Sequence, residues 1–167
     1  SVMLASTHET EEEIIIKNLK QIIKNNQLKI CIAPRHPERI THISKLLIEN
    51  DFSYSLDSKE MNFENDILIV DGFGKLDSYF NNSEIVILGG SFVAKGGHNP
   101  IEPAKHSCAI ISGTHVYNWE NVYNDMLENE ACIILDNVGK LSHIIAEFIK
   151  NKALLEVSKK KALDFSN

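Results

Sequence analysis

Short apolar runs rich in β-branched residues recur along the chain and predict the strands of a sheet. They cover residues 2–5, 28–33, 67–70, 85–88, 109–112 and 132–135, and residues 54–56 are a candidate for a further short strand. Runs of this length that are apolar on both faces are typical of parallel strands covered on both sides. The pattern therefore predicts a parallel sheet with two buried faces.

The segments between these runs have helical spacing instead. Ser6 and Glu9 have the spacing of a capping box for the first helix. Further helices are predicted from Pro37 onward, near residues 119–128, and over residues 138–165. Strands that alternate with helices predict an α/β fold with a Rossmann-like, doubly wound parallel sheet. The first helix carries three leading glutamates and an apolar stripe, namely Glu11, Glu12, Glu13, Ile14, Ile15, Leu19, Ile22 and Ile23.

The fourth apolar run leads into the most glycine-rich stretch of the chain, residues 89–103. This stretch holds four of the eight glycines and two of the four prolines. Asn99 and Pro100 suit the cap and the first turn of a helix, whose free N–H groups attract phosphate. Lys95 and His98 lie on the loop that would cover such an anion. The alternative is a plain tight connection after a buried strand.

Four polar segments each follow a predicted strand. They are residues 6–9, 35–36, 71–74 and 89–102. The carboxyl ends of parallel strands meet at one edge of the sheet, and open sheets of this kind bind ligands there. The four segments therefore predict one shared ligand crevice.

The charged and hydroxyl-bearing candidates in this crevice each have two interpretations. Arg35 offers a planar charged fork that suits phosphate, or else it pairs with Glu38. Ser6 and Thr7 either donate to a phosphate or only cap their helix. Glu102, one turn into the later helix, either complements the helix dipole or accepts hydrogen bonds from sugar hydroxyls.

The histidines and the second glycine pair also leave two interpretations open. His8 and His36 are either pocket residues or packed loop histidines. Gly72 and Gly74 either let a ligand approach the backbone closely or form a plain turn. His115, beyond the next strand, is a weaker candidate for the crevice.

Composition narrows the classes of partner. The net charge is −6, from 17 basic and 23 acidic residues, so no overall basic field favours nucleic acid. No apolar run approaches the roughly 20 residues that cross a bilayer. The three cysteines have no C-x-x-C spacing and the histidines have no metal-ligand spacing, so we expect no disulfide framework, metal or cofactor.

The motifs themselves resemble a known family. Residues 89–104, GGSFVAKGGHNPIEPA, resemble the donor-site segment of the 3-deoxy-D-manno-octulosonic acid (Kdo) transferases of lipopolysaccharide synthesis, which have the two-domain GT-B glycosyltransferase fold. Residues 5–9 (ASTHE) and 34–39 (PRHPER) match the same family in the same order. The resemblance covers essentially the whole chain, but only the C-terminal half of the family. It implies one nucleotide-sugar donor-binding domain over residues 1–167, with C-terminal helices from about residue 138 and no N-terminal acceptor domain.

The resemblance also implies a reaction. Members of this family transfer Kdo from CMP-Kdo to a lipid A precursor, with inversion at the anomeric carbon and without a bound metal. By this resemblance, Glu102 binds the ribose hydroxyls, and Arg35 and His36 line the nucleotide pocket. The residues implied to face the phosphate are Ser91, Gly96, Gly97 and the helix start at Asn99.

The family's general base lies in its N-terminal domain. We therefore expect no catalytic residue in this chain, weak donor binding and no transfer by the chain alone. The full-length protein is expected at the cytoplasmic face of the bacterial inner membrane, and this fragment is expected to be soluble. Two other classes stay open: a GT-B transferase that uses a UDP-sugar, and a non-catalytic nucleotide-binding module whose glycine loop is buried against a partner.

Overall fold

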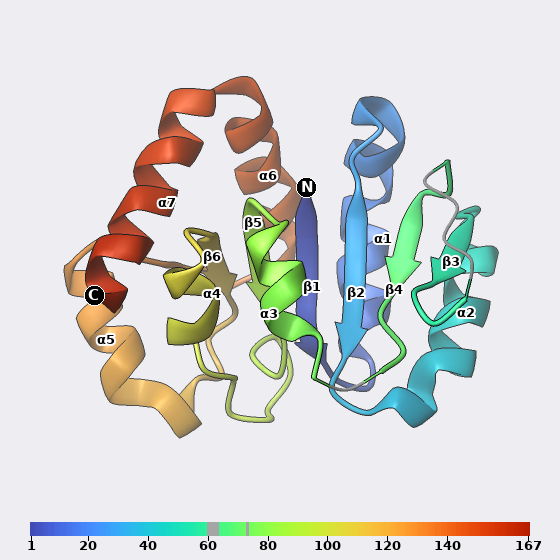
Figure 1. Ribbon diagram of the computed structural model, residues 1–167, viewed down its shortest axis with the longest axis horizontal. Coiled ribbons are helices and arrows are strands. Elements are labelled where there is room, and N and C mark those ends of the chain that lie inside the picture. Colours follow the sequence, from blue (N-terminus) through green and yellow to red (C-terminus); the bar gives the residue numbers. More distant parts are fainter. Residues whose placement is uncertain (60–63, 73) are drawn as a thin grey trace.

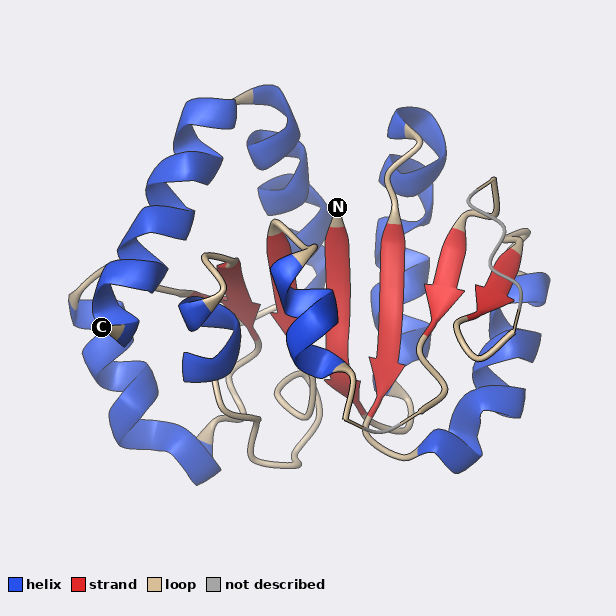
Figure 2. Cartoon of the chain, viewed as in Figure 1, coloured by secondary structure: helices blue, strands red, loops and turns tan. Residues whose placement is uncertain are grey.

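The centre of the molecule is a seven-stranded parallel sheet. A computed structural model describes residues 1–59, 64–72 and 74–167. The strand order is β3-β4-β2-β1-β5-β6-β7, and every pairing is parallel (Figures 1 and 2). Phe73, which belongs to the predicted segment 71–74, lies outside the described residues. The strands are β1 (Val2–Thr7), β2 (Ile30–Pro34), β3 (Tyr54–Leu56), β4 (Ile67–Ile69), β5 (Ile85–Leu88), β6 (Ala109–Ser112) and β7 (Ile133–Ile134).

Helices cover both faces of this sheet (Figure 1). One face packs against α1 (Glu11–Asn26), α2 (Ile40–Glu49) and α6 (Leu141–Lys150). The other packs against α3 (Leu76–Asn81), α4 (Ile101–Lys105) and α5 (Glu120–Glu128), while α7 (Lys152–Ser166) contributes to both cores. Short 3-10 turns precede three of the helices, namely η1 (Pro37–Arg39) before α2, η2 (Tyr117–Trp119) before α5 and η3 (Val138–Lys140) before α6.

Strand β1 shows why the sequence has continuous apolar runs. Val2 and Leu4 lie in one core, and the intervening Met3 and Ala5 lie in the other. Because successive side chains of a strand point to opposite faces, a strand covered on both sides must be apolar throughout. The predicted doubly wound parallel sheet is confirmed.

Within the described residues, no helix is long and apolar enough to cross a bilayer.

The predicted capping box at the start of α1 is wrong. Ser6 remains in β1, at a bulge with a φ of 59°, because pairing with β2 continues as far as Thr7. Helix α1 begins at Glu11, and the side chain of Thr10 before it makes no capping hydrogen bond. The Glu11 carboxylate instead accepts a hydrogen bond from the His8 N–H at 3.1 Å.

The predicted helix over residues 138–165 is divided into two. Asn151 has an extended backbone between α6 and α7, and its side-chain oxygen accepts a hydrogen bond from the Leu154 N–H at 3.1 Å. Asparagine favours this position because its side chain satisfies a free N–H at the helix start. The lysine run 159–161 lies on α7, and each of its side chains forms an ion pair with an acidic side chain.

Candidate functional site

The candidate site lies where the strand order reverses, between β1 and β5. The chain continues from β1 to β2 on one side and from β5 to β6 on the other. Ligands of open α/β sheets bind at such a point, outside the carboxyl ends of the strands. Because all strands are parallel, the segments after β1, β2, β4 and β5 lie along one edge, the lower one in Figure 1, as the sequence predicts.

The glycine loop between β5 and α4 packs tightly against its surroundings. A Cβ atom on Gly89 would lie 2.4 Å from the Ser6 carbonyl oxygen, because the loop crosses directly over the end of β1. Gly96 has a φ of 90°, and a Cβ there would lie 2.3 Å from the side-chain nitrogen of Asn118. Glycine is therefore required at these two positions by contacts within the protein.

The first half of the glycine loop binds a carboxylate of the protein. Glu11 is fully buried, and its Oε1 accepts hydrogen bonds from the N–H groups of His8 (3.1 Å) and Gly90 (2.8 Å). Its Oε2 accepts from those of Ser91 (3.2 Å) and Phe92 (3.0 Å). Burial raises the pKa of Glu11, and the four N–H groups oppose that rise. The amides of residues 90–92 are thus already occupied, and an anionic ligand must be bound by other groups.

Three histidines meet above this carboxylate. The Nε2 atoms of His8 and His98 lie 2.8 Å apart, and the two rings stack with centroids 5.1 Å apart. The His36 ring meets that of His8 edge-on, with centroids 5.6 Å apart. These rings come from the segments after β1, β2 and β5, so the fold brings together residues that are distant in the sequence.

Positive charge accumulates around these histidines. Burial lowers the pKa of His8 to about 4, assisted by His98, His36, Lys95 and Arg35. Burial, Arg35 and His36 likewise lower the pKa of His98. The imidazoles of His8 and His98 are therefore neutral at pH 7. Within the described residues, no group of three or more His, Cys, Asp or Glu side chains could hold a metal ion.

Two cations at this edge have no acidic partner among the described residues. The alternative pairing of Arg35 with Glu38 is not formed, because Glu38 instead lies 4.0 Å from His36 Nδ1. In the part of the chain that the structure describes, the exposed side chains of Arg35 and Lys95 form no ion pair or hydrogen bond. Unpaired cations beside neutral imidazoles attract an anion, and phosphate matches the planar fork of an arginine.

The start of α4 adds an exposed carboxylate. Asn99 caps this helix as predicted, since its Oδ1 accepts a hydrogen bond from the Ile101 N–H at 2.9 Å. The Tyr123 hydroxyl donates to the His98 carbonyl oxygen at 3.1 Å and holds the loop before the cap. Glu102 is exposed, and among the described residues it has no hydrogen-bond or ion-pair partner. Its carboxylate is therefore free to accept hydrogen bonds from a ligand.

Not every predicted residue lies at the surface of this crevice. Ser91 is fully buried, and its hydroxyl donates to the Leu88 carbonyl oxygen (2.6 Å) and accepts from the Gly113 N–H (2.8 Å). Thr7 is also fully buried, and its Oγ1 has no hydrogen-bond partner among the described residues. Gly72 and Gly74 follow β4, which β2 separates from β1, so they lie farther along the edge.

Comparison with known proteins places the chain among Kdo transferases by sequence. No family model matches. The chain is 36% identical over 177 residues to 3-deoxy-D-manno-octulosonic acid transferase of Rickettsia felis, an alignment that covers 98% of the chain. It is 31% identical over 150 residues to the Haemophilus influenzae enzyme of that name and 33% identical over 161 residues to that of Aquifex aeolicus, covering 88% and 95% of the chain. The chain belongs to the Kdo transferase family. It spans 36%, 35% and 44% of these three relatives, less than half of their length.

Solved structures agree on the fold. The structure of the C-terminal CMP-Kdo binding domain of WaaA from Acinetobacter baumannii superposes with a TM-score of 0.92 at 22% identity, covering 98% of this chain and 87% of that one. A glycosyltransferase from Rickettsia africae superposes with a TM-score of 0.70 at 15% identity, covering 99% of this chain and 41% of that one. These likenesses confirm the predicted fold, that of the C-terminal half of a GT-B glycosyltransferase.

The sequence does not predict the contacts of Glu11 and His8 at this candidate site. It indicates Glu11 only as an acidic residue of the first helical turn, and it leaves His8 open between a pocket residue and a packed loop histidine. The signal for Glu11 was available, because a first helical turn that follows β1 lies beside the loop after a neighbouring strand. The residues next to His8 in the sequence give no indication that His98, 90 positions away, lies within hydrogen-bond distance of its ring.

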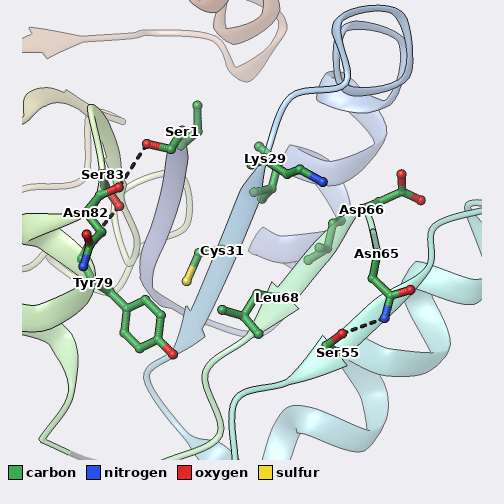
Figure 3. Close-up of a pocket in the computed structure, with 13 residues that line it drawn as sticks. Ser1, Lys29, Cys31, Ser55, Asn65, Asp66, Leu68, Tyr79, Asn82 and Ser83 are labelled. Atoms are coloured by element: carbon green, nitrogen blue, oxygen red, sulfur yellow. Dashed lines mark hydrogen bonds between the residues drawn. The ribbon is translucent and has the colours of Figure 1, made fainter. Parts of the chain in front are cut away.

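A separate cavity lies at the opposite end of the strands. It has a volume of about 280 Å³ and lies between β2, β4 and α3, where Cys31, Leu68 and Tyr79 line it (Figure 3). None of the described residues that line this cavity belongs to the motifs shared with the Kdo transferases. The cavity therefore takes no part in the candidate site.

Proposed function

We propose that this chain is the donor-binding part of a Kdo transferase and that it binds the CMP portion of CMP-Kdo at the β1–β5 crevice. The observation that carries this proposal is the position of Arg35 and Lys95, two cations without an acidic partner among the described residues, beside three histidines at the switch point. Membership of the Kdo transferase family supports the same ligand, as does the fold shared with a domain described as binding CMP-Kdo.

The proposed roles follow the accessibility of each side chain. Arg35, Lys95 and His98 bind the donor phosphate, and His36 lines the nucleotide pocket beside them. Glu102 accepts hydrogen bonds from the ribose hydroxyls. Thr7 and Ser91 support the loops from beneath, since both are buried. Ser6, Gly96, Gly97 and Asn99 border the crevice as backbone or cap, whereas Gly72 and Gly74 lie farther along the same edge.

The reaction that this site serves breaks the bond between the anomeric carbon of Kdo and a phosphate oxygen. The electron pair of that bond goes to the phosphate, so the leaving CMP gains negative charge. Fixed cationic groups stabilise charge that develops in the transition state. Arg35 and Lys95 supply two positive charges at this position, and we propose that they perform this task without a metal ion.

The acceptor and the general base belong to other parts of the transferase in this proposal. A hydroxyl of a lipid A precursor, deprotonated by that base, attacks the anomeric carbon opposite the leaving phosphate and inverts its configuration. Attachment to the inner membrane is likewise assigned to those parts. The 167-residue chain is therefore proposed to bind donor nucleotide and to transfer no sugar by itself.

Calorimetric titration of the 167-residue chain with CMP, UMP and inorganic phosphate tests this proposal, with Glu102→Ala as the variant. We expect CMP to bind more tightly than UMP and phosphate. Loss of a hydrogen bond to a charged group costs about 2 kcal/mol, so Glu102→Ala should weaken CMP binding by about thirty-fold.

Phosphate provides the internal control, because its affinity should not depend on Glu102. Tighter binding of UMP than of CMP would favour a UDP-sugar donor instead. Absence of any nucleotide binding at millimolar concentration would contradict the proposal.

A further inference from the structure

The three consecutive glutamates at the start of α1 have three different environments. Glu11 is fully buried, and its carboxylate accepts hydrogen bonds from four backbone N–H groups. Glu12 is 1% exposed and forms an ion pair with Arg39 of η1. The side chain of Glu13 is 45% exposed and pairs with Lys17 on the same helix. The same helical turn thus contains Glu11, whose carboxylate binds the loops of the site, and Glu13, whose carboxylate does not.

We propose that Glu11 is a positioning residue of the donor site and that its carboxylate sets the separation of the His8 and His98 imidazoles. This inference rests on the proposed function, because these rings lie where the donor phosphate is proposed to bind. Glu11 does not contact the donor. It acts through the backbone of His8 on one side of the switch point and of residues 90–92 on the other.

The geometry of the carboxylate supports this role. Each oxygen accepts two N–H groups, and Oε1 joins the segment after β1 directly to the loop after β5 through His8 and Gly90. A carboxylate has about four acceptor sites, so all of them are used. Among the described residues no cationic side chain pairs with Glu11, and the backbone dipoles alone hold it. All four hydrogen bonds of Glu11 therefore form only when the two loops have this relative position.

Glutamine would disturb these bonds with almost no change in shape. Its side-chain oxygen can accept from one pair of N–H groups, but its NH₂ group then faces the other pair, donor against donor. Two buried N–H groups lose their partner, and an unpaired buried donor is costly. Glutamine therefore loses either the bonds that join His8 to Gly90 or the bonds to Ser91 and Phe92. In both cases we expect Glu11→Gln to loosen the attachment between the two loops and to separate the imidazoles.

The titration of His8 reports this separation. The groups around the His8 and His98 rings are His36, Lys95 and Arg35, with Glu38 beyond His36. Burial and these neighbours hold the pKa of His8 at about 4. Separation of the loops exposes His8 to water and raises this pKa toward 6.5. Removal of the Glu11 negative charge by itself acts in the opposite direction, so the sign of the change identifies its cause.

The test is an NMR titration of the histidine ring signals from pH 3.5 to 8 in the wild-type chain, Glu11→Gln and Glu13→Gln, with the His8 signal assigned through His8→Asn. We expect the His8 midpoint to rise by at least one pH unit in Glu11→Gln and to stay at the wild-type value in Glu13→Gln. CMP affinity at pH 7 should fall about ten-fold or more in Glu11→Gln alone, since small displacements of binding groups are costly.

Glu11→Asp covers the case in which Glu11→Gln does not fold, which its amide spectrum would reveal. Aspartate keeps the charge but is one methylene shorter, so it cannot reach both loops, and the His8 midpoint should again rise. An unchanged His8 midpoint in a folded Glu11 variant would overturn the inference. Failure of the wild-type chain to bind CMP would instead overturn the proposed function, and the His8 midpoint would still decide the role of Glu11.

Discussion

At the scale of single residues, His8 has the surroundings that most strongly affect its protonation. Its imidazole is half-buried, hydrogen-bonded to a second imidazole and close to two cations. Burial, the charges of the neighbouring histidines when protonated, and the two cations disfavour the protonated form of His8. The negative charge of a bound phosphate would favour the protonated form and raise the pKa of His8. The surroundings of His8 in the free chain are therefore suited to an anion.

The pH dependence of stability reports this arrangement. The pKa of His8 is about 4 in the folded chain, against an ordinary value of 6.5. Between these values the unfolded chain binds more protons, so the contribution of His8 to stability is present above pH 6.5 and is lost as pH falls toward 4. We expect thermal unfolding of His8→Asn to depend less on pH across this window than unfolding of the wild type. Equal pH dependence of both melting temperatures would show that His8 titrates normally.

At the scale of elements, the first turn of α1 organises the crevice. Glu11 bonds to the glycine loop, and the next residue, Glu12, binds η1, which follows Arg35 and His36 in the chain. Arg39 Nη1 lies 2.5 and 2.7 Å from the two Glu12 oxygens. One helical turn thus connects the three segments that carry the histidines.

Arg39→Ala tests the second of these connections. Glu12 would remain buried without a partner, and breaking a buried ion pair in this way costs about 3 kcal/mol or more. We expect a correspondingly lower free energy of unfolding in urea. Lys17→Ala removes the exposed pair with Glu13 and serves as the matched control, with a much smaller expected loss. Similar losses in both variants would contradict a connecting role for Arg39.

The elements were predictable where the signal is local. The apolar runs predict the strands, and Asn99 before Pro100 predicts the cap of α4, because each depends on neighbouring residues. The contacts of Glu11 with Gly90 and of His8 with His98 join residues 79 and 90 positions apart. No periodicity encodes such contacts. The capping box failed for a related reason, since pairing with β2 kept Ser6 in the strand.

At the scale of the whole molecule, the two ends of the sheet differ in character. The carboxyl ends carry Arg35 and Lys95, which are unpaired within the described part of the chain, although the whole sequence has a net charge of −6. The amino ends border the mostly apolar cavity of Figure 3. A local positive field on an acidic protein concentrates an anionic ligand at one place and leaves the rest of the surface unattractive to it.

The measurement that tests this account most directly is an amide NMR map of the 167-residue chain titrated with CMP. We predict that the perturbed signals cluster at residues 8–11, 35–36 and 89–102, at the carboxyl ends of β1, β2 and β5. Signals of the cavity residues Cys31, Leu68 and Tyr79 should remain unchanged. Perturbations confined to those three residues and their neighbours, with the crevice unaffected, would contradict the assignment of the donor site.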